Sequence, residues 1–208
     1  MAIRHIVVDL GSVLFHFDHP RRLALLSDMF SLEADRVDAL LWGSGFSAEC
    51  DAGRYGSADE VRAAMRAVVG FQGSDEELNK GWCSAFSPDD AVVEQLRRYR
   101  GDAPLTLFTN NGPLEEEVLP RLFPEAFDSF GQLLFSYRFG LRKPDKAAFE
   151  AAARQLGGDS DGDPGEILFV DDSGTNVEAA RAFGWTALRF EGPETIARAL
   201  GAAGPSSV

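Results

Sequence analysis

Buried-strand patterns and helical patterns alternate along most of the chain. Short runs of Ile, Val, Leu and Phe are typical of strands that are covered on both faces. Between these runs, apolar residues recur every three or four positions, as on the inner face of an amphipathic helix. The pattern therefore predicts an α/β fold with a mostly parallel sheet between two layers of helices. The predicted strands are residues 3–10, 105–111, 132–137, 166–172 and 186–190.

The segment between the first two predicted strands breaks this alternation. Residues 20–101 have a helical pattern throughout, and Ser87 is expected to cap the helix that leads back to the sheet. Because the segment is too long for one crossover between neighbouring strands, we interpret it as an inserted helical cap domain. The predicted boundaries assign residues 17–95 to the cap, and residues 1–16 and 96–208 to a Rossmann-like core.

Composition and charge restrict the possible partners and setting. Twenty Lys and Arg against thirty-three Asp and Glu give a formal net charge of −13, which opposes binding to nucleic acid or to anionic membrane. Cys50 and Cys83 have no zinc-ligand spacing, and two cysteines in 208 residues favour a reducing compartment. The first residues lead directly into a strand pattern, without the apolar stretch of a signal peptide or membrane span. We therefore expect a cytoplasmic protein with neither a nucleic-acid nor a membrane partner.

Polar side chains stand at the carboxyl ends of the predicted strands, where open α/β sheets bind their ligands. Carboxylates that lie close together repel one another unless a cation neutralises them. Mg²⁺ prefers oxygen ligands and commonly shares them with a substrate phosphate, while an Asp can act as a covalent nucleophile. The pattern thus indicates a magnesium site suited to phosphoryl chemistry. The residues that should meet there are Asp9, Thr109, Asn110, Asn111, Lys143, Asp171 and Asp172.

Four stretches of the chain resemble the four motifs of the haloacid dehalogenase (HAD) superfamily. They are VVDLGSV at 7–13, LFTNN at 107–111, LRKP at 141–144 and FVDDSGTNVEAA at 169–180. Their order is that of the superfamily, and the helical insertion lies between the first two. The resemblance looks closest to the branch that holds bacterial sugar-phosphate phosphatases and the N-terminal phosphatase domain of soluble epoxide hydrolases. It implies a Rossmann-like HAD core with a helical cap.

The resemblance also implies a nucleophile and a set of metal ligands. Asp9 would attack phosphorus and would also bind Mg²⁺. The backbone carbonyl of Gly11 would be a second ligand. Asp172 would be the ligand from the fourth motif, with Asp171 beside it as a ligand or a water-mediated partner. Asn176 is either a supporting residue of this site or a surface turn residue.

A second set of residues would hold the phosphoryl group, as the resemblance implies. Thr109 and the Asn110 amide would contact it directly. Lys143 would pair with both Asp9 and the phosphate. Ser12 is a further candidate through its amide or hydroxyl, although a plain turn role fits it equally well.

Gly11 departs from the motif of the superfamily. Most phosphatases of the superfamily carry a second Asp there, which protonates the leaving group and then activates water. Such a general acid/base is typically worth about 10²–10⁴ in rate. Three explanations are open: the substrate has a good leaving group such as an anomeric sugar oxygen, another group replaces the Asp, or the protein is slow or inactive. His16 and Asp18 are the nearby candidates in sequence.

Other aromatic and charged residues are expected to have structural roles. His19 reads as a solvated hinge residue, Trp42 as core and Phe17 as cap packing, with the substrate pocket as the second interpretation of Phe17. Arg22 is either an exposed residue at a helix start or a contact for an anionic substrate. The acidic run at 115–117 is expected to be a solvated first turn that interacts favourably with the helix dipole.

Together these features predict a Mg²⁺-dependent phosphatase that hydrolyses a small phosphorylated metabolite, such as a sugar phosphate, through an aspartyl phosphate. One alternative is a metal-independent 2-haloacid dehalogenase, in which Asp9 would displace halide from carbon. Asp171 and Asp172 disfavour it, because without a metal they would repel an anionic substrate. A second alternative is a catalytically idle HAD-like binding module. A phosphotransferase or mutase is a third.

Overall fold

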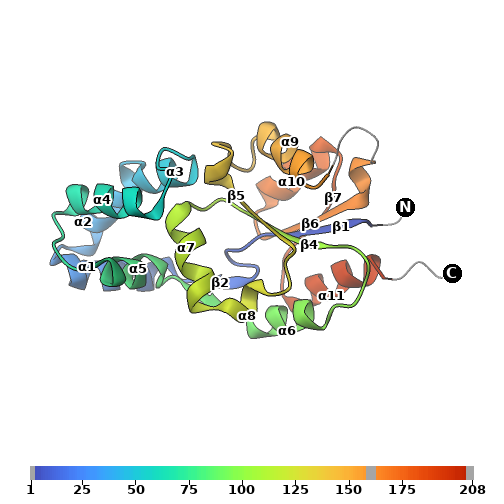
Figure 1. Ribbon diagram of the computed structural model, residues 1–208, viewed down its shortest axis with the longest axis horizontal. Coiled ribbons are helices and arrows are strands. Elements are labelled where there is room, and N and C mark those ends of the chain that lie inside the picture. Colours follow the sequence, from blue (N-terminus) through green and yellow to red (C-terminus); the bar gives the residue numbers. More distant parts are fainter. Residues whose placement is uncertain (1–2, 158–162, 205–208) are drawn as a thin grey trace.

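A five-stranded parallel sheet with the order β5-β4-β1-β6-β7 forms the centre of the computed structural model, which describes residues 3–157 and 163–204 (Figure 1). Each predicted strand is present, and the predicted α/β class is confirmed. Because β1 is the central strand, Asp9 lies in the middle of the carboxyl edge of the sheet, between β4 and β6. The strands are β1 (His5–Val8), β4 (Leu105–Thr109), β5 (Gln132–Phe135), β6 (Ile167–Asp171) and β7 (Thr186–Arg189).

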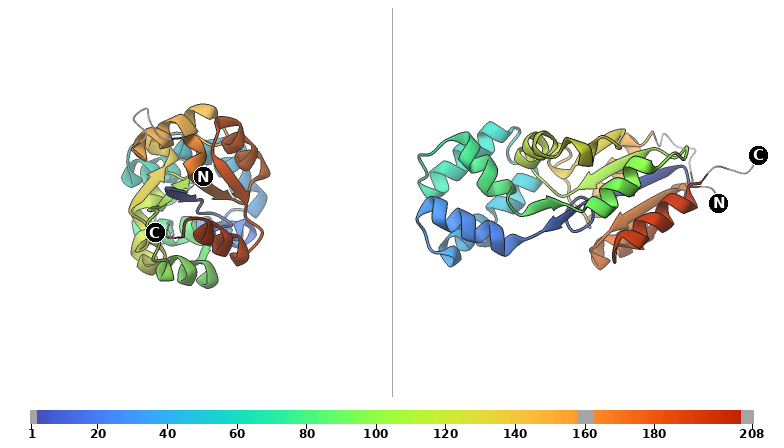
Figure 2. Two further views of the ribbon diagram at one scale, coloured as in Figure 1. Left: turned by 90° about the vertical axis from the view of Figure 1, so that its right-hand side faces the viewer. Right: turned by 90° about the horizontal axis from the view of Figure 1, so that it is seen from below.

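Helices cover both faces of this sheet (Figure 2). Along β1 the side chains alternate between faces. Val7 belongs to an apolar cluster with Phe149 and Val177, whereas Ile6 and Val8 belong to a second cluster on the other face. The first cluster includes side chains of α9 (Lys146–Gln155) and α10 (Gly174–Phe183), and the second includes those of α6 (Asp90–Arg98), α7 (Pro113–Leu122), α8 (Pro124–Phe127) and α11 (Pro193–Ala202). Two short 3₁₀ turns, η2 (Ser136–Arg138) and η3 (Pro164–Glu166), complete this part.

A block of helices extends beyond the carboxyl edge of the sheet, at the end of the molecule opposite to the described termini (Figure 1). We call it the helical block. It consists of α1 (His19–Phe30), α2 (Ala34–Asp38), a π-helical turn η1 (Ala39–Gly43), α3 (Phe46–Asp51), α4 (Ala58–Val69) and α5 (Asp75–Cys83). None of the described helices combines the length and the apolar character that crossing a bilayer requires.

A two-stranded antiparallel ribbon joins the helical block to the rest of the molecule. It pairs β2 (Phe15–Phe17) with β3 (Phe86–Pro88), and His16 lies opposite Ser87. The prediction of helix throughout 20–101, with Ser87 as a helix cap, was therefore wrong here. Asp89 caps α6 instead, since its carboxylate accepts hydrogen bonds from the backbone amides of Ala91 and Val92 at 3.0 and 3.2 Å. Strands of three residues are too short to show an alternating pattern.

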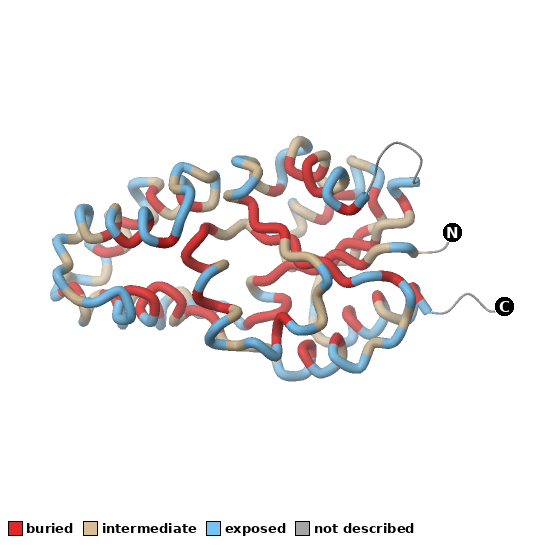
Figure 3. The backbone as a smooth tube through the Cα atoms, viewed as in Figure 1, coloured by how far each residue is buried: buried red, intermediate tan, exposed pale blue. Residues whose placement is uncertain are grey.

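The helical block packs firmly onto the sheet-containing part. Helices α4 and α5 contact α7, which follows β4. Leu26, Met65 and Trp82 of the block belong to the same apolar cluster as Leu114 of α7 and Ile6 of β1. The buried backbone in Figure 3 accordingly runs from the strands into the inner faces of these helices, while their outer faces are exposed. The helical block therefore packs against α7 and stands over the strand ends.

Candidate active site

Lys143 forms a buried ion cluster with two carboxylates at the centre of the strand ends. Its Nζ donates hydrogen bonds to Asp9 Oδ1 at 2.7 Å, to Asp171 Oδ2 at 2.7 Å and to the backbone oxygen of Phe108 at 2.8 Å. An ammonium has three protons, so all of them are used. The rings of Phe108 and Phe169 lie 5.0 and 5.1 Å from Nζ, and the side chain is 1% exposed. Lys143 is therefore a fixed positive charge.

Burial and mutual repulsion change the pKa values in this cluster. Burial raises the pKa of Asp9 to about 7; Lys143 opposes the increase and Asp171 adds to it. Burial and the neighbouring Asp171 likewise raise the pKa of Asp172. Burial alone would lower the pKa of Lys143, but Asp9 and Asp171 raise it, and the net direction is upward. One ammonium thus faces three carboxylates, and a further cation would favour their ionised forms.

The donor set at the strand ends fits a hard divalent cation. Carboxylate oxygens of Asp9, Asp171 and Asp172 lie within 4.8 Å of one another. Oxygen-only ligands of this kind suit Mg²⁺. Asp171 is the most constrained of the three, because Lys143, the Ser173 amide at 2.9 Å and the Asn176 side chain at 3.0 and 3.1 Å all donate to its oxygens. Asp9 and Asp172 have the freer oxygens. Asn176 supports Asp171 and is more than a surface turn residue.

The side chains at the end of β4 form hydrogen bonds with one another and with the backbone of Lys143. The Asn110 side chain donates to the Lys143 backbone oxygen at 2.8 Å and accepts from the Lys143 backbone amide at 2.9 Å. It therefore positions the segment that carries the ammonium, which leaves its own backbone N–H as the group available to a ligand. Thr109 is buried, and its hydroxyl oxygen accepts from Asn111 at 2.6 Å. Ser12 is exposed, with a left-handed backbone at φ 60°.

A cavity of about 500 Å³ lies between the strand ends and the helical block. It has two walls, which we name by their origin. The strand-end wall consists of Asp9, Gly11, Ser12, Thr109, Asn110, Asn111, Lys143 and Asn176. The helical wall comes from the helical block, the β2–β3 ribbon and α7, and consists of Phe17, His19, Arg22, Trp42, Ser47, Asp51, Phe86 and Glu115.

Arg22 gives the helical wall a buried positive charge. It is 4% exposed, and its guanidinium lies 4.6 to 5.2 Å from the rings of Trp42, Phe17 and Trp82. Its contacts are with His19 Nδ1 at 3.2 Å and the Trp82 backbone oxygen at 3.5 Å. Within the described residues it has no ion pair, and its buried Nε has no hydrogen-bond partner. Burial lowers the pKa of Arg22. Such a cation favours an anionic or oxygen-rich group in the cavity.

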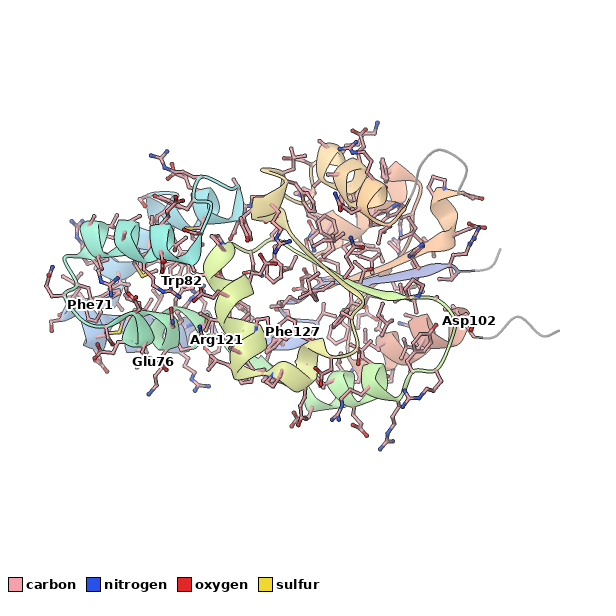
Figure 4. The ribbon with its side chains drawn as sticks, viewed as in Figure 1. Phe71, Glu76, Trp82, Asp102, Arg121 and Phe127 are labelled. Atoms are coloured by element: carbon pink, nitrogen blue, oxygen red, sulfur yellow. The ribbon has the colours of Figure 1, made fainter. Side chains whose placement is uncertain are left out.

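Asp51 and Glu115 place two acids on the same wall. Glu115 Oε1 accepts a hydrogen bond from Trp82 Nε1 at 2.6 Å, and Figure 4 shows Trp82 inside the helical block, next to α7. Burial raises the pKa of Glu115 above its usual range. Burial and the nearby Glu115 together raise the pKa of Asp51 well above its ordinary value, against the opposing effects of Arg142 and Arg22.

A comparison with known proteins gives the same family as the four sequence motifs. Residues 3–184 match the family model of haloacid dehalogenase-like hydrolases. The chain belongs to this family. It is 25% identical, over 91% of its length and 92% of the relative, to a D-ribitol-5-phosphate phosphatase of Bacteroides thetaiotaomicron. It is 31% identical, over 64% of its length and 66% of the relative, to the sesquiterpene phosphatase astK of Aspergillus oryzae.

A solved structure shows the same fold. The magnesium complex of a HAD family enzyme from Bacteroides thetaiotaomicron superimposes on this hydrolase with a TM-score of 0.75 at 23% identity, covering 91% of this chain and 93% of the other. The resemblance inferred from the four motifs is therefore confirmed at the level of family and fold.

The structure brings the predicted strand-end residues of this HAD-like hydrolase together, but it does not bring the predicted replacements for the missing acid to them. Neither His16 nor Asp18 is among the described residues that line the cavity. His16 is exposed and lies 3.9 Å from Asp89. Asp18 caps α1 by accepting from the Arg21 amide at 2.9 Å. His16 lies in the β2–β3 ribbon and Asp18 at the start of α1, so both side chains are directed to other roles away from the cavity.

Sequence reasoning missed most of the helical wall of the hydrolase. His19, Trp42 and Glu115 were expected to be structural, yet they line the cavity. A usable signal exists for Arg22, which stands four residues before Leu26 and so lies on the buried stripe of an otherwise amphipathic helix. A charge on such a stripe indicates a site. No local signal of this kind marks Asp51.

Proposed function

We propose that this hydrolase is a Mg²⁺-dependent phosphatase that acts on a small phosphorylated metabolite through an aspartyl phosphate at Asp9. One observation carries the proposal: Asp9 is buried at the head of a cavity, with Lys143 on one oxygen and two further carboxylates within 4.8 Å. Both curated relatives named above are phosphatases, which supports the same reaction class.

In this proposal the strand-end wall carries the attack on phosphorus. Asp9 attacks phosphorus, and Lys143 holds the attacking carboxylate in place while its positive charge attracts the phosphoryl group. The Thr109 hydroxyl and the Asn110 backbone N–H orient the phosphoryl oxygens, with Ser12 at the exposed side. These groups are fixed before substrate arrives, so little reorganisation is needed in the transition state.

A bound Mg²⁺ would be held by Asp9, the Gly11 carbonyl and Asp172, with Asp171 as a water-mediated partner. When bound, it would neutralise the charge on the phosphoryl oxygens. The engagement of both Asp171 oxygens with protein donors is the reason for assigning Asp172 the direct contact.

The helical wall would select the substrate. We propose that residues 17–95 act as a cap that excludes bulk water from Asp9. Arg22, flanked by aromatic faces and facing two acids, suits a leaving group that carries several oxygens, such as a sugar. The two buried cysteines, which form no disulfide, are in keeping with a cytoplasmic setting.

The decisive experiment is a screen of phosphorylated metabolites with Mg²⁺ and with a chelator, using the purified chain, Asp9→Asn and the exposed control Asp35→Asn. We expect Mg²⁺-dependent turnover by the parent chain and the control, and none by Asp9→Asn. Retained phosphatase activity in Asp9→Asn would refute the covalent mechanism. Turnover of chloroacetate without metal would support the dehalogenase alternative. Phosphate binding without turnover would support the idle binding module.

A further inference from the structure

Gly11 leaves open which group protonates the leaving group. A Cβ atom at Gly11 would meet nothing within 4 Å, so there is room beside Asp9 where the family motif places an Asp. The other titratable groups among the described residues of the cavity lining are Lys143, Arg22, His19, Glu115 and Asp51. Each can be examined for a proton that it is free to give.

Four of these groups are committed elsewhere. Lys143 uses all three protons in the ion cluster, and an Arg does not deprotonate in proteins. Both ring nitrogens of His19 have partners, Arg22 at 3.2 Å and Asp38 at 3.3 Å. Glu115 accepts a hydrogen bond from the indole N–H of Trp82, and this contact and the nearby Arg22 favour its ionised form.

Asp51 is held against the strand ends, although it belongs to the helical block. It is the last residue of α3, and its backbone oxygen accepts a hydrogen bond at 2.7 Å from Ser136, which follows β5. The same hydroxyl lies 3.3 Å from the backbone oxygen of Asn111. A Cβ atom at Gly112 would lie only 3.2 Å from the Cβ of Cys50. The end of α3 therefore docks on the loop that carries the phosphoryl-binding candidates.

The Asp51 carboxyl has no hydrogen-bond partner among the described residues. Its side chain is 15% exposed, and within the described residues its only close charged neighbour is Arg142 at 3.7 Å, with no hydrogen bond to the carboxyl. Burial and the Glu115 carboxylate raise its pKa well above the ordinary value, while Arg142 and Arg22 oppose that increase. Asp51 lines the same cavity as Asp9, and a carboxyl with a raised pKa and no internal hydrogen bond is suited to donate a proton to a ligand.

We propose that Asp51 is the general acid and base of this hydrolase, in place of the Asp that the motif usually carries at Gly11. The proposal rests on the phosphatase function proposed above. As Asp9 bonds to phosphorus, the bond to the leaving oxygen breaks and Asp51 transfers its proton to that oxygen. The products of this step are the alcohol, the aspartyl phosphate and an Asp51 carboxylate.

The second step restores both carboxyl groups. Water attacks phosphorus and gives a proton to the Asp51 carboxylate. The bond between phosphorus and Asp9 breaks at the same time, releasing inorganic phosphate and the Asp9 carboxylate. A proton donor from the helical block would also make proton transfer depend on how the leaving group sits against that wall.

The test compares Asp51→Asn with the parent chain on phosphate esters whose leaving groups differ in basicity. On alkyl phosphates, which need protonation, we expect turnover to fall about 10²-fold or more. On p-nitrophenyl phosphate, a good leaving group, we expect little change. Both rates come from one sample, so a folding defect would lower them together. Glu49→Gln, an exposed acid on the same helix that pairs with Arg54, is the matched control and should change neither rate.

Two further readouts sharpen the test. Adding Gly11→Asp to Asp51→Asn should restore alkyl-phosphate turnover towards the parent value, since it supplies an acid at the vacant position. In the parent chain, kcat/KM on alkyl phosphates should fall as pH rises through the pKa of Asp51, because the acid must be protonated. Burial and Glu115 of α7 raise that pKa, and Arg142 ahead of α9 and Arg22 of α1 oppose the increase. In Asp51→Asn, kcat/KM should no longer show this decrease with pH.

The outcomes separate the two proposals. An equal loss on good and poor leaving groups, a rise in KM alone, or no loss would overturn the role of Asp51 while leaving the phosphatase function intact. A parent chain without Asp9-dependent turnover of any ester would overturn both.

Discussion

Both walls of the cavity contain basic and acidic side chains, but these are well paired on the strand-end wall and poorly paired on the helical wall. On the strand-end wall, Lys143 and Asp171 each have several partners between 2.7 and 3.1 Å. On the helical wall, Arg22 has no ion pair among the described residues and Asp51 has only a distant one. Satisfied charges are fixed in position, whereas unsatisfied buried charges favour a ligand that completes them. We infer that the strand-end wall carries the attack on phosphorus, whereas the helical wall selects the substrate and, through Asp51, supplies the proton.

Lys143→Met should have the largest effect of the variants proposed here, because Lys143 joins Asp9 to Asp171 at the centre of the strand ends. Removing one partner of a buried ion cluster leaves carboxylates unpaired, at a cost of about 3–5 kcal/mol in unfolding free energy. Turnover should fall about 10²–10³-fold on every substrate, as for the loss of a preorganised electrostatic contact. Steady-state rates on two chemically different esters and a melting curve check this. Lys146→Met, which removes an exposed pair with Glu150, is the control. A loss confined to one ester would contradict the division of roles.

Magnesium should stabilise the protein more at about pH 8 than at about pH 5. An unfolded Asp titrates near 4, and burial raises the pKa of Asp9 to about 7. Between these values the folded state binds more protons, so the contribution of Asp9 to stability falls as pH rises. A cation that binds the ionised form offsets this loss, by about 2.7 kcal/mol at a hundred times its Kd. Melting temperatures with and without Mg²⁺ measure the effect. Equal gains at both pH values, or an undiminished gain in Asp172→Asn, would contradict it.

The strand-end wall could be predicted from the sequence because a local pattern and a general rule suffice. Asp9 and Asp171 each follow a run of buried apolar residues, and parallel strands bring their carboxyl ends to one edge. Lys143 lies in the segment that joins the third strand to the next helix. The family motifs then added roles that the residue types alone leave open.

The helical wall could not be predicted in the same way. Arg22, Asp51 and Glu115 come from α1, α3 and α7, and their meeting depends on how these helices pack rather than on any local periodicity. The β2–β3 ribbon was not predicted for a related reason: it pairs residues that are far apart in the chain. Burial of Glu115 also reversed the expectation of a solvated first turn, since α7 packs under the helical block.

Arg22→Met should change substrate binding while leaving the reaction step nearly intact. A hydrogen bond to a charged group is worth about 1.5–3 kcal/mol, so KM for the best metabolite should rise at least tenfold with a smaller change in kcat. Unfolding free energy should not fall, because a buried charge without an ion pair is replaced by an apolar chain of similar length. Arg21→Met, at the exposed neighbouring position, is the control. A drop in kcat on every substrate would assign Arg22 to the reaction instead.

Trp82→Phe should have the smallest effect on turnover and isolate one contact of the helical wall. The substitution keeps an aromatic ring but removes the N–H that binds the buried Glu115 carboxylate, which costs about 1.5–3 kcal/mol of unfolding free energy. Trp185→Phe is an instructive control, because the buried N–H of Trp185 has no partner among the described residues. Both variants lose a similar volume, and only the first loses a hydrogen bond. The difference between their melting temperatures therefore measures the contact. Because the helical wall holds none of the proposed Mg²⁺ ligands, Trp82→Phe should change KM slightly and leave the Mg²⁺ requirement unchanged. An altered Mg²⁺ requirement would show that the two walls are coupled.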